Sequence, residues 1–289
     1  GDAPSTIYPD RKGKNFLSLN PIDEDQNVVA FWENHRLQLR SSFEANKIVY
    51  NIPIPNPAFR MQRSHLRVYT ERDGQKGNDL LIPLHQGEVI ETSDKLERSD
   101  WHTSMMYFMM VDRFANGDST NDNPVQDSMI HPKANFYGGD LAGVHQKVTD
   151  GFFTDLGVNT IWVSPISKNP SGAWGLWDKG GVTTKFSGYH GYWPVSNVIP
   201  DHRFGDSAAV QNMLDAAHRR EMNVLLDYVA NHVHKEHPVY RENPDWATEL
   251  YLPDGSLNTE RWDEYRLTTW FDTFMPTLDL RRKEIVDPM

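Results

Sequence analysis

Oxygen-bearing side chains gather around glycines in two segments of the chain. One segment contains Asn116-Gly-Asp118 followed by Asn121 and Asp122, and the other reads Tyr137-Gly-Gly-Asp140. A hard cation such as Ca²⁺ takes roughly six to eight oxygens from carboxylates, amides and backbone carbonyls. The two segments therefore predict a Ca²⁺ site, and the alternative for such a string is a solvated Asp/Asn turn without metal.

Aromatic and imidazole side chains stand together in the run Tyr189-His190-Gly191-Tyr192-Trp193. An aromatic face stacks on the apolar face of a sugar ring, and a neutral imidazole donates a hydrogen bond to a sugar hydroxyl. Gly191 lets the backbone turn sharply between the two side chains. The run predicts a sugar-binding surface, and the alternative is a buried aromatic loop.

A third polar run, Asp227-Tyr-Val-Ala-Asn231-His232, overlaps the end of the apolar stretch 222–229. If that stretch is a strand, alternation places Asp227, Val229 and Asn231 on one side, with His232 at the rim. The alternative is a satisfied buried Asp and an Asn that caps the strand end.

The elements that would position these motifs alternate between strands and helices. Strands are expected at 105–111, 158–164 and 222–229, with helices at 140–156 and 206–221. The first helix shows apolar residues at helical spacing as far as Phe152 and Leu156, and Gly157 ends it. This order predicts a parallel sheet with right-handed crossovers, and the long loops follow strand carboxyl ends, where (β/α)₈ barrels build their sites.

The region before residue 100 has a different pattern. Short strand-like runs lie at 47–52, 65–69 and 79–84, with Asp73-Gly74 and Gly77-Asn78 as turn signals between the last two. We expect a small all-β, immunoglobulin-like sandwich with a linker over 1–100, short enough that further strands could precede Gly1. The first half of a (β/α)₈ barrel is expected over 101–289, with a long loop at about 234–274 after the third strand.

Composition excludes several classes of function. The formal net charge is −11 and the sequence has no basic run, which argues against a nucleic-acid partner. The absence of cysteine excludes disulfides, zinc-thiolate sites and a cysteine nucleophile. No stretch approaches about 18 consecutive apolar residues, so no transmembrane segment is expected.

Taken together, the segments 111–118, 137–140, 188–193 and 227–232 resemble the α-amylase family of glycoside hydrolases, in particular its cyclodextrin glucanotransferases and neopullulanases. The resemblance covers about residues 103–280. It implies that Tyr192 is the platform for the sugar, that His190 binds its primary hydroxyl and that His232 contacts the substrate. The resemblance also implies a Ca²⁺ site formed by Asn116, Asp118, Asn121, Asp122, the Gly138 carbonyl and Asp140. It further implies that Asn231 binds a calcium beneath the long loop and that Asp227 supports the site.

The catalytic carboxylates of that family have no counterpart here. Retaining glycosidases need two carboxylates about 5–5.5 Å apart. In the family the nucleophilic Asp lies in a Gly-x-Arg-x-Asp motif on the fourth strand, and the acid/base Glu lies on the fifth. The 289 residues contain no such motif. No catalytic residue is therefore assigned, both carboxylates are expected beyond Met289, and this chain is expected to be inactive alone.

The resemblance implies an intact protein that hydrolyses or transfers α-1,4-linked glucans, such as starch and maltodextrins, with retention. One alternative is a noncatalytic α-glucan-binding protein, and another is an unrelated α/β enzyme or Ca²⁺-stabilised domain with chance motifs. Export to the periplasm, the cell envelope or the medium is expected, with a cytoplasmic location left open. Homo-oligomerisation and the preferred glucan stay open as well.

Overall fold

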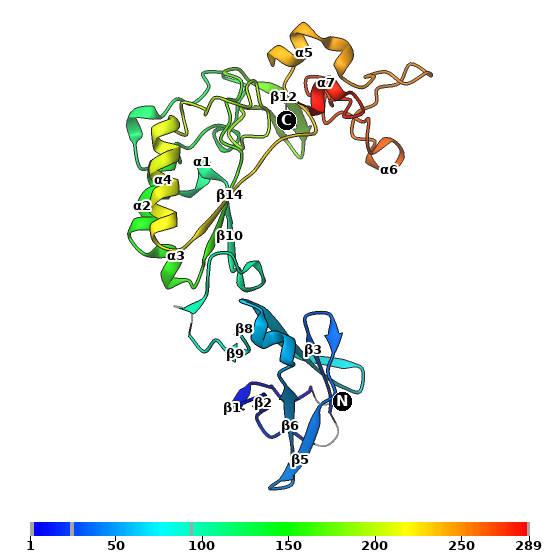
Figure 1. Ribbon diagram of the computed structural model, residues 1–289. Helices are drawn as coiled ribbons and strands as arrows, with labels where there is room; N and C mark the ends of the chain where they lie inside the picture. Colours follow the sequence, from blue (N-terminus) through cyan, green and yellow to red (C-terminus); the bar gives the residue numbers. More distant parts are fainter. Residues whose placement is uncertain (1–2, 24–25, 93–94, 288–289) are drawn as a thin grey trace. The chain divides into compact units, whose positions relative to one another are not determined.

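The computed structural model describes residues 3–23, 26–92 and 95–287. The chain divides into two compact units, Gly1–Thr103 and Ser104–Met289, which Figure 1 shows in blue to cyan and in green to red. Each unit has its own hydrophobic core.

The first unit contains two antiparallel sheets, with strand orders β1-β2-β6-β5 and β4-β3-β7-β8-β9. The strands of the first sheet are β1 (Pro9–Gly13), β2 (Phe16–Leu19), β5 (Arg40–Glu44) and β6 (Lys47–Pro53). Those of the second are β3 (Asn27–Trp32), β4 (His35–Arg36), β7 (Ser64–Arg72), β8 (Gln75–His85) and β9 (Glu88–Val89). The described residues also form the short 3₁₀ helices η1 (Asn56–Arg60) and η3 (Trp101–Thr103).

Side chains from both sheets share one core, so the sheets pack face to face. Leu17 and Ile52 come from the first sheet, and Leu66 and Ile82 from the second. The strands expected at 47–52, 65–69 and 79–84 lie within β6, β7 and β8.

The turn between β7 and β8 is formed by Asp73 and Gly74 alone. Both have positive φ, 50° and 78°, as a two-residue hairpin turn requires. The second turn signal was wrong, because Gly77 and Asn78 lie inside β8. There Asn78 exchanges hydrogen bonds with the backbone of Ile7.

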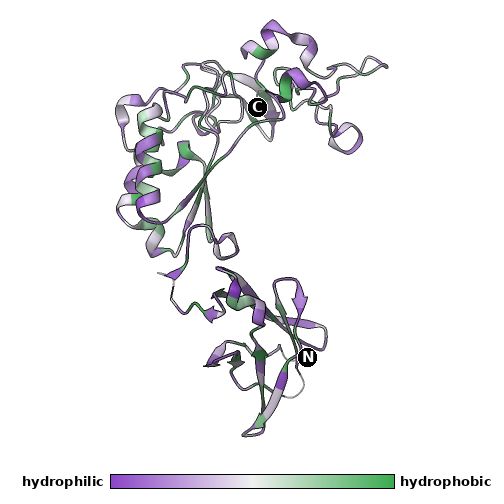
Figure 2. Ribbon diagram, viewed as in Figure 1, coloured by the Kyte–Doolittle hydropathy of each residue, from purple (hydrophilic) through white to green (hydrophobic). Residues whose placement is uncertain are grey.

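The second unit is built on a parallel sheet of β10 (Met106–Met109), β11 (Thr160–Val163) and β14 (Asn223–Leu226), in that order. Figure 1 shows α2 (Leu141–Thr149), α3 (Phe152–Asp155) and α4 (Ser207–Arg219) on one side of these strands. Figure 2 shows hydrophilic and hydrophobic residues around α2 and α4, as helices that cover a sheet require. This architecture fits part of a (β/α)₈ barrel, as expected.

An aspartate caps the start of each of the two longer helices, and Asp140 is buried whereas Asp206 is exposed. The Asp140 side chain accepts a hydrogen bond from Gly143 N at the start of α2, and Asp206 accepts one from Ala209 N at the start of α4. Each carboxylate satisfies a backbone donor that the first helical turn leaves without a partner.

The single helix expected over 140–156 was wrong, because the helix breaks at Asp150 and Gly151. Gly151 has φ of 91° and begins α3 in a new phase. As a consequence Phe153 is completely buried, whereas Leu156 is 55% exposed. The apolar spacing had instead placed Phe152 and Leu156 on the buried face.

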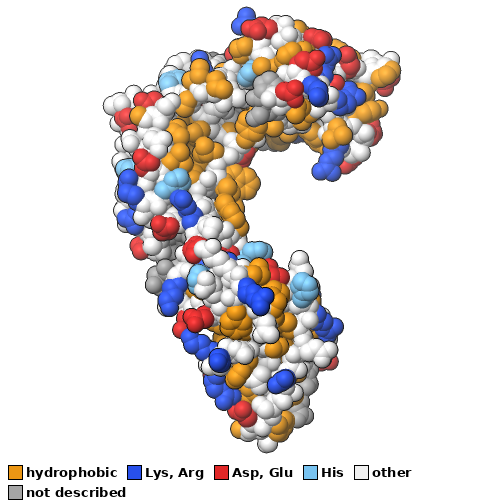
Figure 3. Space-filling model, in the orientation of Figure 1, with side chains coloured by type: hydrophobic (Ala, Val, Ile, Leu, Met, Phe, Trp, Pro, Cys, Tyr) orange, Lys and Arg blue, Asp and Glu red, His pale blue; other side chains and the backbone are white. Residues whose placement is uncertain are grey.

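The core of this unit lies between the sheet and its helices. Its buried side chains include Val111, Leu141, Val144, Phe153, Ile161, Val163, Phe204, Met213 and Met222. On the side away from the helices, the rings of Phe108 and Trp162 meet at 5.2 Å and stay 47% and 38% exposed. Figure 3 shows hydrophobic side chains gathered there over the strands.

The remaining elements lie in the loops that follow the strands. They are α1 (Val111–Phe114), η4 (Ser119–Asn121), η5 (Pro132–Ala134), the hairpin β12 (Trp174–Lys179) and β13 (Val182–Phe186), α5 (Pro238–Glu242), η6 (Pro244–Trp246), α6 (Trp262–Tyr265) and α7 (Lys283–Val286). The expected loop at 234–274 thus contains α5, η6 and α6. Within the described ranges, no helix is long and apolar enough to cross a membrane.

Replacing Phe153 by Ala should lower the free energy of unfolding by about 3–5 kcal/mol, because the fully buried ring packs against Tyr107 and Phe114. Leu156→Ala, which truncates an exposed side chain in the same segment, should change it by less than about 0.5 kcal/mol. Denaturant unfolding of both variants tests the position of the helix break. Equal losses of unfolding free energy in the two variants would contradict a break at Gly151.

Candidate functional site

The three polar motifs lie in the loops that follow the carboxyl ends of the parallel strands, and the second and third of them meet at Tyr192. The last strand ends at Leu226, one residue before Asp227. The expectation that strand alternation orients Asp227, Val229 and Asn231 was therefore wrong, because these residues lie outside the strand. Local contacts orient them instead, beginning with Asp227 N, which donates to Val163 O at 3.1 Å.

The structure brings all three predicted substrate residues together around Tyr192. The Tyr192 hydroxyl donates to Asp227 Oδ2 at 2.8 Å, and its backbone carbonyl accepts from His232 Nε2 at 3.0 Å. The His190 ring stacks on the Tyr192 ring, with centroids 5.9 Å apart. Gly191 connects the two with φ of 86°, and a Cβ there would overlap the Pro165 carbonyl, so glycine is required.

Hydrogen bonding fixes the proton positions on the two histidines. Tyr192 N donates to His190 Nδ1 at 3.0 Å, so the neutral ring of His190 carries its proton on Nε2. Burial, the neighbouring His232 and the charge of Arg113 lower the pKa of His190 to about 4. Burial also lowers the pKa of His232, against the opposing effect of its bond to the Tyr192 carbonyl. Both rings are therefore neutral near pH 7, and His190 keeps a donor at Nε2.

Tyr192 remains a protonated phenol throughout the physiological range. Burial, together with the hydrogen bond to Asp227 and its negative charge, raises the pKa of Tyr192 to about 12. The hydroxyl is thus a fixed donor to the carboxylate, and this bond holds the plane of the ring. A ring held in this way is suited to stacking on a pyranose.

Further aromatic rings, which the sequence reasoning did not assign, surround this cluster. Trp193 contacts His190 at 4.8 Å between centroids, and Phe274 contacts Trp193 at 5.0 Å. Phe271 lies 4.6 Å from the ring of His232. The available signal was the aromatic run Trp270 to Phe274 in the long loop, although its sequence does not indicate which motif it reaches.

The predicted cation ligands also form one cluster, apart from Asn231. Asn116 Nδ2 donates to Asp122 at 2.9 Å, and Asn121 Nδ2 donates to Asp140 Oδ2 at 3.2 Å. The Asp140 carboxylate also accepts from the backbone of residues 117, 118 and 143, at 2.6–3.0 Å. Asp118 accepts from the backbone and hydroxyl of Thr120, and these bonds lower its pKa.

Two observations fit this cluster to a bound cation. Asn121 Oδ1 is buried and accepts no hydrogen bond from the described residues, which leaves an oxygen available as a ligand. Gly138 has φ of 93°, and a Cβ there would overlap the Asp122 carboxylate and the Asn116 amide, so its backbone approaches both side chains closely. In the described part of the chain, no three His, Cys, Asp or Glu side chains gather as metal ligands do. A cation here would therefore need amide and carbonyl oxygens in addition to carboxylates.

Asn231 lies elsewhere, next to His232 and the segment that follows the long loop. Its carbonyl accepts from Leu278 N at 2.9 Å, and its side-chain nitrogen is 3.4 Å from His232 Nδ1. The structure thus places this residue beside the predicted sugar ligand.

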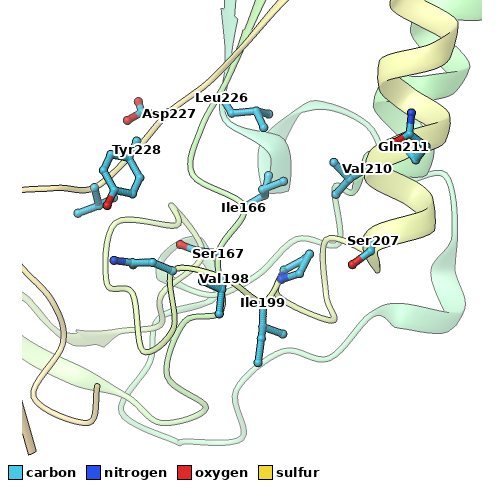
Figure 4. A pocket seen from close by; sticks show the side chains of 13 residues that line it. Ile166, Ser167, Val198, Ile199, Ser207, Val210, Gln211, Leu226, Asp227 and Tyr228 are labelled. Carbon is cyan, nitrogen blue, oxygen red and sulfur yellow. The ribbon is translucent and has the colours of Figure 1, made fainter. Parts of the chain in front are cut away.

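A cavity of about 310 Å³ is lined in part by Asp227. Figure 4 shows its walls, with Val210 and Gln211 on α4, Ile166 after β11, and Tyr228 after β14. The lining is mostly apolar, including Val198 and Ile199, which suits the packing of another hydrophobic segment better than a polar sugar. We therefore locate the candidate site at Tyr192 and not in this cavity.

Comparison with known proteins supplies a family context. The family model described as "Alpha amylase, catalytic domain" matches residues 108–269, more than half of the chain. The chain is 34% identical over 167 residues to a cyclomaltodextrin glucanotransferase of Paenibacillus macerans, covering 55% of this chain and 21% of that protein. It is 36% identical over 175 residues to the periplasmic alpha-amylase of Escherichia coli (strain K12), covering 58% of this chain and 25% of that protein.

Among solved structures, the Anoxybacillus alpha-amylase aligns at 28% identity with a TM-score of 0.49, over 64% of this chain and 36% of that chain. The chain spans about a fifth to a quarter of the length of the two curated relatives.

The low pKa of His190 predicts a measurable pH dependence of stability. The ring is harder to protonate in the folded state than in the unfolded state, where its pKa is about 6.5. The neutral ring therefore contributes fully to the free energy of unfolding above pH 6.5. This contribution is lost as the pH falls toward 4, and about 2 kcal/mol of it is gone at pH 5. Between pH 7 and pH 5, His190→Asn should lose less unfolding free energy than the wild type, and equal losses would contradict the assignment.

Proposed function

We propose, since this chain belongs to the alpha-amylase family, that the intact protein hydrolyses or transfers α-1,4-glucosidic bonds in starch and maltodextrins. The names of its relatives, a glucanotransferase and an amylase, support this substrate class. The proposed mechanism is retaining, with a nucleophilic Asp and an acid/base Glu on later strands, about 5–5.5 Å apart.

The observation that carries the proposal is the cluster formed by Tyr192, His190, His232 and Asp227. Asp227 orients the Tyr192 ring as a platform for a glucose unit, through the bond of 2.8 Å to the hydroxyl. His190 offers its Nε2 proton to the primary hydroxyl of that unit, because Nδ1 is occupied by Tyr192 N. His232 donates a hydrogen bond to the Tyr192 carbonyl and so holds the backbone of the platform residue. It also contacts the sugar at the rim of the site.

Alpha-amylase family proteins generally bind Ca²⁺, and we assign one ion to the cluster after β10. Asn116, Asp118, Asn121, Asp122, the Gly138 carbonyl and Asp140 would hold it, and the backbone bonds of Asp140 also organise the loop. The ion would supply positive charge to an oxygen-rich loop and so stabilise its fold. Asn231 would belong to a separate calcium site beneath the long loop.

For the 289-residue chain itself, we propose glucan binding without hydrolysis. Its sequence contains no Gly-x-Arg-x-Asp motif, and the Asp227 carboxylate is engaged by the Tyr192 hydroxyl. The second candidate is a protein that binds α-glucans through the same Tyr192 cluster and has no catalytic role. The two candidates differ in whether a longer form of the protein cleaves the glucan.

The two units would have different roles. We assign the two-sheet unit, residues 1–100 with the linker, to an immunoglobulin-like sandwich that helps to hold α-glucans or to pair subunits. Residues 101–289 would be the first half of the catalytic barrel. Export is proposed as well, supported by the periplasmic location in the name of one relative.

A calorimetric titration with maltoheptaose tests the site. Tyr192→Ala should weaken binding about tenfold, because it removes the stacking surface, which is worth roughly 1.5 kcal/mol. Tyr192→Phe, which keeps the ring but not the bond to Asp227, should lose less affinity. Tyr251→Ala, which removes an exposed ring in the long loop, should bind as the wild type does.

Unchanged binding by Tyr192→Ala would exclude the platform. In the same samples, chromatography should recover the oligosaccharide intact. Glucose or maltose released by the pure wild-type chain, and absent with Tyr192→Ala, would overturn the proposal that this chain does not hydrolyse.

A Ca²⁺ titration into EDTA-treated protein tests the metal. Asn121→Ala should bind one Ca²⁺ fewer than the wild type, because it removes the buried Oδ1 that has no protein donor. Asp178→Asn, on the exposed hairpin strand β12, should bind the wild-type number of ions. An unchanged stoichiometry in Asn121→Ala would remove this loop as a calcium site.

A further inference from the structure

The side chain of Arg113 lies between the two proposed sites. The Arg113 guanidinium carbon is 3.7 Å from the centre of the Tyr137 ring and 4.0 Å from that of the Tyr189 ring. Tyr137 precedes the proposed cation ligand Gly138, and Tyr189 precedes the proposed sugar ligand His190. A planar cation between two aromatic faces holds both rings, because it is attracted to each of them.

Toward the proposed Ca²⁺ site, Arg113 is linked to the Gly138 segment through the carboxylate of Asp112. Asp112 is buried, forms an ion pair with Arg113 at 3.1 Å, and accepts hydrogen bonds from Tyr137 N and Gly138 N. Its backbone carbonyl accepts from Gly139 N at 2.9 Å. The segment that presents the Gly138 carbonyl is thus held by Asp112, and Arg113 is held by the same carboxylate.

On the sugar side, the contacts run through three rings. The Tyr189 ring lies 5.2 Å from the ring of His190, which in turn stacks on Tyr192 at 5.9 Å. A shift of the Tyr189 ring would therefore move the imidazole that offers its Nε2 proton to the sugar. Arg113 is also tied to a third segment, because its side chain donates to Lys133 O at 3.0 Å.

We propose that Arg113 is a positioning residue that couples the two sites, so that Ca²⁺ bound at the cluster 116–140 increases the affinity of the Tyr192 site for α-glucans. The inference rests on the proposed function. Ca²⁺ holds Gly138 and hence Tyr137, the guanidinium transmits that position to Tyr189, and Tyr189 sets the ring of His190. Coupling of this kind is reciprocal, so the glucan increases the affinity for Ca²⁺ by the same factor.

Four calorimetric titrations measure the coupling in the full chain. The dissociation constant of maltoheptaose is determined with Ca²⁺ and with EDTA, and that of Ca²⁺ with and without saturating maltoheptaose. In the wild type the two dissociation constants within each pair should differ by the same factor, about tenfold. Equal dissociation constants within each pair would overturn the inference and leave the proposed function intact. A wild-type chain that binds no maltoheptaose would remove both.

Two variants test whether Arg113 carries the coupling. Arg113→Lys keeps the charge but loses the planar group that stacks between the rings, and the factor should fall below about twofold. Tyr137→Leu, at a side chain that is 56% exposed, removes one ring and leaves the backbone donors to Asp112, and it should have the same effect. In both variants the affinity for Ca²⁺ without sugar should stay within about twofold of the wild-type value, which a general loss of structure would not allow.

The matched control is Arg203→Lys. Arg203 also lies over an aromatic ring, that of Phe136 at 3.9 Å, and pairs with Asp201 at 2.7 Å. Within the described residues, the cation that lies over Tyr137 and Tyr189 is Arg113 and not Arg203. This variant should keep the tenfold factor. Loss of coupling in Arg203→Lys to the same extent, or its retention in Arg113→Lys and Tyr137→Leu, would contradict the assignment to Arg113.

Discussion

Parallel pairing of β10, β11 and β14 is the constraint on which the rest of the second unit depends. Because the three strands run in the same direction, their carboxyl ends meet at one edge, and the loops that follow them must share that edge. Arg113 follows β10, Tyr192 lies in the long loop after β11, and Asp227 follows β14. Their contacts therefore come from the topology of the sheet and not from proximity in the sequence.

Buried carboxylates organise the loops at that edge. Asp112 and Asp140 each accept several backbone N–H groups, and Asp201 accepts from Asn169 N and from the Arg203 side chain. Burial raises the pKa of Asp112 above its ordinary range, although its hydrogen bonds and Arg113 oppose this. Burial also raises the pKa of Asp201, but the hydrogen bonds and the charge of Arg203 outweigh burial, so the pKa of Asp201 is lowered. Each carboxylate replaces the regular backbone pairing that a loop lacks.

The sequence allowed the sheet order and the grouping of the motifs to be predicted, because strands that alternate with helices leave few topologies. It did not allow the helix break at Gly151 to be predicted, since apolar spacing continued through Phe152 and Leu156 while a glycine with φ of 91° changed the phase. The hairpin β12–β13 was missed although Gly180-Gly181 is a hairpin signal. The position of Arg113 between two rings depends on tertiary contacts that no local pattern encodes.

The proposed function depends on recognition of α-linked glucans by the cluster around Tyr192. The most direct measurement is saturation-transfer NMR with equal concentrations of maltoheptaose and the β-linked glucan cellohexaose, in the presence of Ca²⁺. If the cluster binds α-linked glucans, saturation should transfer to the maltoheptaose protons, less so in Tyr192→Ala, and little should transfer to cellohexaose. Equal transfer to both oligosaccharides, or transfer to maltoheptaose that Tyr192→Ala leaves unchanged, would contradict it.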